Sequence, residues 1–234
     1  MNDKITAIVL AAGQGKRMNT LVAKQFLELK NKPVLYYSLK AFEESSVDEI
    51  ILVCGHGQIG YCKDNIVKPY GFTKVKQIIE GGTERYDSVY KSLQAIDQTD
   101  YVLIHDGARP FILFTLINEV IEAVRESQAC VVATPVKETI KIVDPEGWVK
   151  ETPSRNLLWS AQTPQAFEYD YIKEAYEILY MQDREERKCF TDDAMVFETF
   201  IKKPVNIVKG DNNNIKLTTT EDYALAGILA DELF

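Results

Sequence analysis

Residues 5–24 read ITAIVLAAGQGKRMNTLVAK and begin with an apolar run that ends at a glycine-rich loop. Apolar, β-branched runs of this length, bounded by glycine, are typical of buried strands in a parallel sheet. Gly13 and Gly15 carry no Cβ, so the backbone can turn tightly and present its N–H groups to a ligand. Arg17 and Lys24 follow, and the stretch contains no acidic side chain that would neutralise them. It therefore predicts a first strand followed by a loop that binds a polyphosphate.

Other interpretations of this loop compete with phosphate binding. A glycine-rich turn between a strand and a helix can be purely structural. A P-loop requires G-x-x-x-x-G-K-[ST], and the Gly15-Lys16 pair lacks both that spacing and the hydroxyl. The dinucleotide-binding fingerprint requires a third small residue where this chain has Arg17 and Met18, which weakens the case for a dinucleotide-dependent oxidoreductase.

The composition is that of an ordinary globular protein. A chain of 234 residues can bury the core of one α/β domain, so we expect residues 1–234 to form a single domain. The net charge of −8 argues against a general nucleic-acid-binding protein, whereas nucleotide binding needs only local positive charge. No apolar stretch reaches membrane-spanning length. We therefore expect neither nucleic acid nor a membrane as a partner.

The four cysteines are scattered along the chain, at positions 54, 62, 130 and 189, with no C-x-x-C pair. This spacing argues against a zinc site and against structural disulfides. Cys54 and Cys130 lie in apolar runs, where we expect buried free thiols. Reduced thiols fit a cytoplasmic protein.

Beyond the first loop, apolar strand patterns alternate with amphipathic helix patterns. Strands are expected at residues 49–54, 74–79, 101–104 and 130–134, and helices at residues 34–42, 59–70, 85–95 and 113–126. Strands that alternate with helices require right-handed crossovers and a largely parallel sheet covered on both faces. The sequence therefore predicts an α/β fold around a mostly parallel, twisted sheet.

The pattern changes in the segment that follows. Residues 138–148, ETIKIVDPEGW, alternate polar and apolar side chains, and Asp144, Pro145 and Gly147 give a turn signal. This pattern predicts a protruding β-hairpin arm over about residues 137–155. Two strands alone are marginally stable in water, so the arm should pack on another surface. We expect that surface to be the second subunit of a homodimer.

Three predicted strands end in residues suited to ligand binding, namely Gly13, Gly82 and Asp106. Ligands of open α/β sheets bind at the carboxyl ends of the strands, so these residues should line one crevice. Asp106 is the candidate magnesium ligand, because Mg²⁺ binds one or two carboxylates together with phosphate oxygens. The alternative is an aspartate that caps a turn. His105 is expected in the core or behind the site, and with His56 as the only other histidine we expect neither a histidine metal site nor a triad.

Eight sequence blocks follow one another along the chain. They are LAAGQGKRM, KQFLEL with KPVLYYSL, GGTERYDSV, HDGARPF, KETIK, RNLLWSAQTPQAF, TDDA and GDNNNIKLTTTEDY. In this order and at these separations they resemble the 2-C-methyl-D-erythritol 4-phosphate cytidylyltransferase (IspD) family over nearly the whole chain. The related ribitol-5-phosphate cytidylyltransferases tend to carry LAGG in the first loop and a Met-Tyr-Gln-Gly run before Gln-Thr-Pro-Gln. Ala11-Ala12 and residues 156–161 therefore favour the methylerythritol branch.

This resemblance implies a Rossmann-like sheet of the nucleotidyltransferase type and an Mg²⁺-dependent homodimeric enzyme. The enzyme would transfer CMP from CTP to 2-C-methyl-D-erythritol 4-phosphate in the non-mevalonate route to isoprenoid precursors. One alternative is a cytidylyltransferase for ribitol 5-phosphate or another polyol phosphate. Another is a regulator on the same scaffold that binds nucleotide without catalysis, which the retained cations disfavour.

The resemblance also assigns roles to individual residues. Arg17, Lys24 and Lys216 match the catalytic cations that hold the triphosphate. The nucleotide site corresponds to Ala11, Ala12, Gly13, Gly15, Gly82, Thr83, Ser88 and Asp106, with Asp106 also near the metal. The acceptor site corresponds to Arg109, Thr139, Arg155, Thr163 and Thr191, with Arg109 and Thr139 in the region where the arm brings subunits together. Taken alone, Lys216 and Arg155 are ordinary solvated cations, so their roles rest on the resemblance.

Two residues depart from the family pattern. Ala23 stands where the family usually has proline, so we expect the loop that carries Lys24 to be more mobile without ligand. Thr83 stands where an aspartate is common. This change is harmless if only the backbone N–H of Thr83 binds the nucleotide, and it should alter the affinity for CTP if the side chain contributes.

Overall fold

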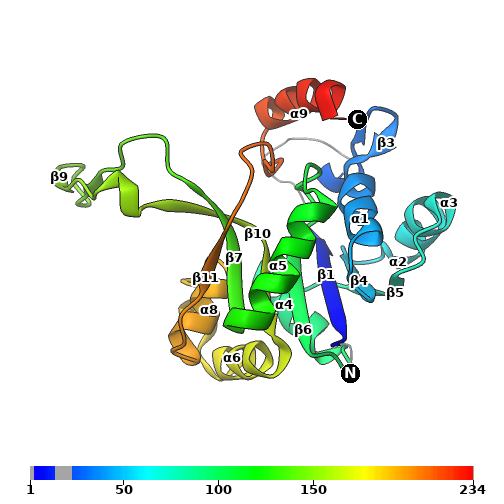
Figure 1. Ribbon diagram of the computed structural model, residues 1–234, viewed down its shortest axis with the longest axis horizontal. Coiled ribbons are helices and arrows are strands. Elements are labelled where there is room, and N and C mark those ends of the chain that lie inside the picture. The colour runs from blue at the N-terminus through cyan, green and yellow to red at the C-terminus, as the bar shows by residue number, and fades with distance from the viewer. Residues whose placement is uncertain (1–2, 14–22, 234) are drawn as a thin grey trace.

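The computed structural model describes residues 3–13 and 23–233, which are built around a central sheet (Figure 1). Within these residues the sheet has seven strands, in the order β11-β7-β10-β6-β1-β4-β5. Their bounds are β1 (Ile5–Ala11), β4 (Glu49–Cys54), β5 (Val75–Glu80), β6 (Tyr101–Asp106), β7 (Ala129–Pro135), β10 (Trp159–Glu168) and β11 (Asn206–Lys209). β1 pairs in parallel with β4 and β6, and β4 with β5, whereas β10 runs antiparallel between β6 and β7. The predicted mostly parallel α/β sheet is confirmed.

The two faces of the sheet are covered by helices α1 (Val34–Glu44), α4 (Arg85–Gln94), α5 (Phe114–Ser127), α6 (Tyr169–Met181) and α8 (Asp193–Phe200). Apolar residues of each strand alternate between two cores, so that Ala7 and Val9 of β1 enter one core and Ile8 the other. The first core is completed by α1 and α5, and the second by α4, α6 and α8. Burial on both faces explains why these strands are almost continuous apolar runs.

The antiparallel strand β10 is the main element that the sequence pattern does not predict. Its sequence, WSAQTPQAFE, contains two glutamines and a proline, so neither an apolar run nor clean alternation marks it as a strand. The buried glutamines are stabilised by hydrogen bonds, as when Gln165 Nε2 donates to Asp192 Oδ2 at 3.0 Å. The pairing of β10 with β6 brings Thr163 beside Asp106, whose N–H donates to Thr163 Oγ1 at 3.0 Å.

Several shorter elements complete the described part of the chain. They are η2 (Lys24–Phe26), β2 (Glu28–Leu29), β3 (Lys32–Pro33), α2 (Ile59–Tyr61), η3 (Cys62–Val67), α3 (Lys68–Tyr70), η4 (Arg155–Leu157) and α7 (Arg184–Arg187). The segments α2, η3 and α3 follow one another directly and form the predicted helix over residues 59–70, with a π-helical middle. Gly71 ends this helix with a φ of +67°, a left-handed conformation that glycine adopts at little cost.

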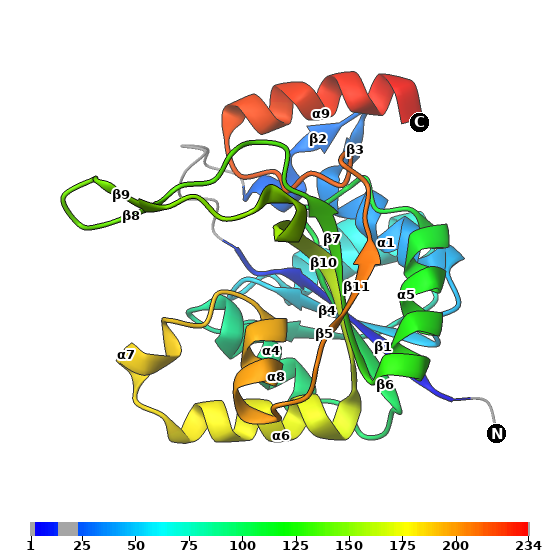
Figure 2. The ribbon, with the colours of Figure 1, turned by 60° about the vertical axis from the view of Figure 1, so that its left-hand side comes forward.

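The hairpin arm projects away from the sheet (Figures 1 and 2). It carries β8 (Ile142–Val143) and β9 (Val149–Glu151), which pair antiparallel. At the turn, Gly147 N–H donates to the carbonyl oxygen of Asp144 at 3.0 Å, so the predicted hairpin and its turn are confirmed. Trp148 is 75% exposed, so the arm presents an aromatic surface that the described part of the chain leaves uncovered.

The C-terminal helix α9 (Thr220–Leu233) lies outside the sheet and packs on the β2–β3 hairpin (Figure 2). The segment that leads into it is anchored where Leu217 N–H donates to the carbonyl oxygen of Ala108 at 2.9 Å, just beyond the end of β6. This anchor brings Lys216 to the carboxyl ends of the central strands.

All four cysteines are free, and Cys54 and Cys130 are buried as expected. Among residues 3–13 and 23–233, no helix has the length and apolar character needed to cross a bilayer.

Candidate active site

A cavity of about 850 Å³ lies at the carboxyl ends of β1, β5 and β6. Of the residues predicted for the nucleotide and catalytic sites, it is lined by Ala11, Ala12, Gly13, Lys24, Gly82, Thr83, Ser88, Asp106 and Lys216. Gly15 and Arg17 lie outside the described residues. The structure therefore brings the described members of both predicted sets into one hollow, at the expected edge of the sheet.

Lys24 and Lys216 meet in this cavity although they are far apart in the sequence. Lys24 Nζ donates to the carbonyl oxygen of Leu217 at 2.8 Å, and Lys216 Nζ contacts Asp106 Oδ2 at 2.8 Å. Lys24 begins η2, which Gln25 fixes by donating from Nε2 to the last carbonyl of β1 at 2.5 Å. Two cations from different elements thus face one hollow, as the binding of a polyphosphate requires.

Ala23 has the backbone conformation that a proline would have at this position before Lys24. Its φ of −60° and ψ of 136° lie in the region to which proline is restricted. The departure from the family pattern at this position therefore leaves the conformation of the chain before η2 compatible with that pattern.

Gly81 and Gly82 form another wall of the cavity, and neither has room for a side chain. A Cβ at Gly81 would lie 2.6 Å from Ser88 Oγ, and a Cβ at Gly82 would collide with the Asp87 side chain. Ser88 Oγ accepts a hydrogen bond from Gly82 N–H at 3.0 Å. The wall is therefore backbone held in place by α4, a surface suited to hydrogen bonding with a flat base.

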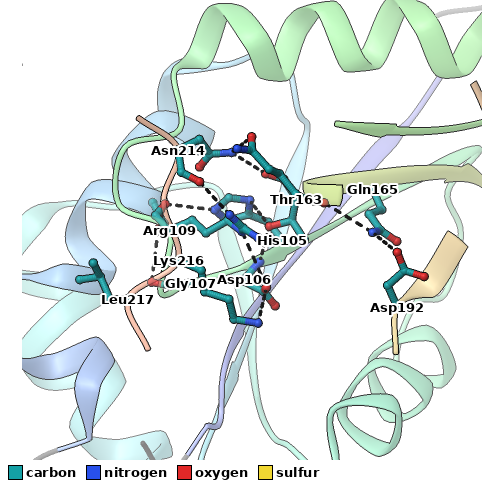
Figure 3. Close-up of polar contacts among 12 residues, drawn as sticks. His105, Asp106, Gly107, Arg109, Thr163, Gln165, Asp192, Asn214, Lys216 and Leu217 are labelled. Carbon is teal, nitrogen blue, oxygen red and sulfur yellow. Dashed lines mark hydrogen bonds and ion pairs between the residues drawn. The ribbon is translucent and has the colours of Figure 1, made fainter. Parts of the chain in front are cut away.

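Asp106 faces three cations at the edge of this cavity, of which Figure 3 labels Lys216 and Arg109. Lys216 Nζ lies 2.8 Å from its Oδ2, Arg85 Nε lies 3.3 Å from its Oδ1, and Arg109 Nε lies 3.9 Å from Oδ2. Burial alone would raise the pKa of this carboxyl, but the charges of Arg85, Lys216 and Arg109 together hold the pKa well below its usual range. Asp106 is therefore ionised at neutral pH.

Arg85 and Asp193 form a buried ion pair that the sequence analysis did not single out. Arg85 Nη1 and Nη2 each donate to one oxygen of Asp193 at 2.7 Å, and Tyr176 Oη donates to Asp193 Oδ1 at 2.6 Å. Arg85 lies in the GGTERYDSV block and Asp193 in the TDDA block, 108 positions later. In the sequence, only their membership in two of the family blocks marked these residues. A local pattern could not reveal the pairing, because the two residues are far apart along the chain.

His105 lies behind Asp106, as expected of a residue that supports the site. It is fully buried, its ring lies 5.1 Å from that of Phe42, and its Nδ1 lies 3.1 Å from Thr163 Oγ1. Burial lowers the pKa of His105 to about 3, with the neighbouring Arg109 acting in the same direction. His105 is therefore neutral and serves to hold Thr163, which in turn accepts the Asp106 N–H.

The buried His105 should make the protein less stable in mild acid. Its pKa is about 3 in the folded protein and 6.5 in an unfolded chain, so between these values only the unfolded chain binds the proton. The free energy of unfolding therefore falls as the pH falls, by about 2 kcal/mol between pH 7 and pH 5. Asp106 titrates well below this window. Urea unfolding at the two pH values should show a loss about 2 kcal/mol larger in the wild type than in His105→Gln, and equal losses would contradict this origin.

A second cavity, of about 260 Å³, adjoins the first and contains part of the predicted acceptor site. Thr163, Thr191 and Arg109 line it. Arg109 belongs to the tight turn after β6 rather than to the arm, because its N–H donates to the Asp106 carbonyl at 2.9 Å and its Nη1 to the Asn214 carbonyl at 2.7 Å. Within one chain Arg109 therefore lies apart from the arm, and its expected place in the region where subunits meet stays a prediction.

Thr139 and Arg155 lie elsewhere. Both are exposed on the hairpin arm, and neither lines the two cavities of its own chain. Arg155 Nη1 donates to the carbonyl oxygen of Lys137 at 3.0 Å, a contact within the arm. The structure of one chain thus divides the predicted acceptor residues between the second cavity and the arm.

Known proteins resemble this chain over nearly its whole length. The family model described as IspD, 2-C-methyl-D-erythritol 4-phosphate cytidylyltransferase, matches residues 5–232. The chain belongs to the IspD family. Similar IspD proteins include that of Lachnoclostridium phytofermentans, 51% identical over 230 residues that cover 98% of this chain and 97% of the relative. The Clostridioides difficile protein is 45% identical over 223 residues, which cover 94% and 91% of the two chains.

Solved IspD structures share the fold. The 4-diphosphocytidyl-2C-methyl-D-erythritol synthase from Anaerococcus prevotii matches with a TM-score of 0.86 at 34% identity, covering 98% of this chain and 96% of that one. The 2-C-methyl-D-erythritol 4-phosphate cytidylyltransferase from Thermus thermophilus matches with a TM-score of 0.74 at 27% identity, covering 96% and 98%. The resemblance carried by the eight sequence blocks is therefore confirmed, together with the nucleotidyltransferase type of the sheet.

Proposed function

We propose that this IspD-family protein transfers CMP from CTP to 2-C-methyl-D-erythritol 4-phosphate, giving 4-diphosphocytidyl-2-C-methyl-D-erythritol and pyrophosphate in the non-mevalonate route to isoprenoid precursors. The observation that carries the proposal is that the two cavities share Arg85, Asp106 and Lys216. CTP in the larger cavity and the acceptor in the smaller one would bring their phosphates together at these three side chains. Family membership supplies the identity of the two substrates.

The chemistry needs positive charge and alignment more than it needs a protein nucleophile. The acceptor phosphate is already an anion, so one of its oxygens can form the new bond to the α-phosphorus of CTP while the bond to pyrophosphate breaks. Lys24 and Lys216, with Arg17 from the first loop, supply positive charge where the transition state gathers negative charge. Binding of the two substrates in adjoining cavities would bring the attacking oxygen close to the α-phosphorus.

The donor set at the shared edge fits a magnesium ion that the nucleotide itself largely binds. Asp106 is ionised and borders both cavities, while no group of three His, Cys, Asp or Glu side chains suited to a metal occurs among the described residues. Mg²⁺ typically takes one or two protein carboxylates and completes its shell with phosphate oxygens and water. We infer that Asp106 holds the ion together with the triphosphate, where its charge would neutralise the departing pyrophosphate.

The arm supports a homodimer of single-domain chains. Its exposed Trp148 is the kind of large aromatic side chain that anchors protein interfaces. Because Thr139 and Arg155 lie outside the cavities of their own chain, we propose that contacts of the arm with a second subunit bring them to an acceptor site. The free thiols fit the expected cytoplasmic location.

A panel of phosphate acceptors tests the proposed function against its nearest rivals. The protein is incubated with CTP, Mg²⁺ and either 2-C-methyl-D-erythritol 4-phosphate, ribitol 5-phosphate or glycerol 3-phosphate, and pyrophosphate release is followed. We expect rapid release with the methylerythritol substrate alone. Preference for another polyol phosphate would replace the acceptor in the proposal, and CTP binding without release for any acceptor would favour the regulator.

Replacing Arg155 by lysine should weaken binding of the acceptor and leave CTP binding intact. A guanidinium can bind a phosphate through two parallel hydrogen bonds, whereas an ammonium group binds it as a point charge. We expect KM for methylerythritol phosphate to rise about tenfold, the effect of losing roughly 1.4 kcal/mol, with KM for CTP changed less than about twofold. Steady-state kinetics with each substrate varied in turn measures both, and Arg184→Lys on α7 is the matched control. Equal changes in the two KM values would show that Arg155 acts elsewhere.

A further inference from the structure

Arg85 stands at the junction of the two cavities, and the catalytic roles described so far do not include it. It lines both of them, and its side chain is 28% exposed. It is the first residue of α4, directly after the Glu84 that caps this helix. Its Nε points at Asp106 Oδ1 at 3.3 Å. Arg85 thus places a permanently charged side chain where the two proposed substrate sites meet.

The guanidinium of Arg85 is held in one orientation by its other contacts. Both terminal nitrogens bind the Asp193 carboxylate at 2.7 Å, and such a parallel pair of bonds fixes the plane of the group. Asp193 is fully buried and is itself held by Tyr176 Oη at 2.6 Å. Asp193 therefore clamps Arg85, and the clamped Arg85 keeps one N–H directed at Asp106.

Lys216 is held at Asp106 less firmly than Arg85 is, so its side chain can move away. Its side chain is 36% exposed and reaches Asp106 through a flexible four-carbon stem, with one contact at 2.8 Å. If Lys216 moves to a phosphate, Asp106 still faces Arg85 at 3.3 Å and Arg109 at 3.9 Å. Without Arg85, and with no metal ion bound, the departure of Lys216 would leave a buried carboxylate with only the more distant Arg109. An ionised buried group without a partner is costly, so Lys216 would be retained by Asp106.

We propose that Arg85 is a positioning residue that, clamped by Asp193, holds the Asp106 carboxylate so that Lys216 can transfer from Asp106 to a substrate phosphate. This inference rests on the proposed function only in taking CTP as the ligand. It predicts that the effect of Arg85 depends on Lys216. A side chain that contacted the nucleotide directly, or that merely supported the fold, would act independently of Lys216.

A double-mutant cycle tests this dependence. Arg85→Gln and Asp193→Asn are combined in one variant, which removes one positive and one negative charge and leaves no unpaired charge between them. CTP affinity is measured by calorimetry in EDTA, so that no metal ion compensates Asp106, for this neutral-pair variant, for Lys216→Ala, for all three substitutions together and for the wild type. We expect the neutral pair to raise the Kd for CTP about tenfold when Lys216 is present and less than about twofold when alanine replaces it, a coupling of the size seen for residues in one network. Equal effects in the two backgrounds would overturn the inference.

A matched control guards against a general effect of changing charges. Arg125 and Glu122 form an ion pair on α5, away from both cavities. Arg125→Gln with Glu122→Gln makes the same change in charge and should leave CTP affinity unchanged in both backgrounds. Circular dichroism of each variant verifies the fold.

The same proteins separate this inference from the proposed function. Pyrophosphate release by the wild type is measured separately with Mg²⁺ and the acceptor present. If the wild type binds CTP but releases no pyrophosphate, the proposed function fails while the coupling in CTP affinity still decides the role of Arg85. If the wild type does not bind CTP, both are wrong.

Discussion

Lys216→Ala should lower kcat by about 10²–10³-fold, the usual cost of removing one group that stabilises transition-state charge. Lys216, whose Nζ contacts Asp106 Oδ2 at 2.8 Å, lines a cavity that also contains Lys24, and both side chains face the place where the triphosphate would lie. The substitution truncates a partly exposed side chain, so the fold should survive. Steady-state pyrophosphate release with saturating CTP, Mg²⁺ and methylerythritol phosphate measures the loss, and Lys24→Ala should show a loss of similar size.

Lys40→Ala is the matched control for this prediction. Lys40 is an exposed residue of α1 that does not line either cavity, and its Nζ lies 3.6 Å from Glu44 Oε1. Its replacement should leave kcat within about twofold of the wild type, because isolated surface ion pairs contribute little. Turnover at the wild-type rate in Lys216→Ala would remove this residue from the catalytic machinery.

Asp193→Ala should lower the free energy of unfolding by about 3 kcal/mol, because breaking a buried ion pair leaves its other member without compensation. The carboxylate of Asp193 is fully buried and accepts hydrogen bonds from Arg85 and Tyr176, so both partners lose their contacts. The value lies at the lower end of the range for buried pairs because the Arg85 side chain keeps 28% of its exposure. Urea unfolding at pH 7 measures it.

The neutral-pair variant serves as the reference for this stability change. With Arg85→Gln and Asp193→Asn together, no charge is left unpaired, and much of the lost stability should return, since buried ion pairs contribute little beyond a well-packed neutral pair. A loss below about 1 kcal/mol in Asp193→Ala would mean that water replaces the missing carboxylate and that the pair is not a structural element of α4 and α8.

The parallel part of the fold could be predicted because burial on both faces leaves a mark within a few residues. β1 lies in the apolar run predicted to be the first strand, and the predicted bounds of the second strand, residues 49–54, match β4. β10 could not be predicted in this way because its polar side chains are stabilised by partners far along the chain. Gln162 and Gln165 belong in the interior only because Asp211, Asp192 and neighbouring backbone groups accept their hydrogen bonds. Such partners appear only after the chain has folded.

The residues of the candidate site likewise differ in whether local sequence could place them. The glycine-rich loops and Asp106 could be placed from the sequence, because each follows a recognisable strand. Lys216 needed the family resemblance, since its position depends on the contact between Leu217 and Ala108. Arg85 was missed because its chemistry depends on Asp193, which no local pattern connects to it.

The shared border of the two hollows also shapes how the enzyme could be inhibited. A single molecule that joins a cytosine nucleoside to a short polyol phosphate through a stable phosphonate bridge would fill both at once. Once one half is seated, the other half is confined close to its own pocket, as if supplied at high local concentration. Such a bisubstrate compound should bind far more tightly than either fragment, and the spacing of its two halves is set by the three side chains at that border.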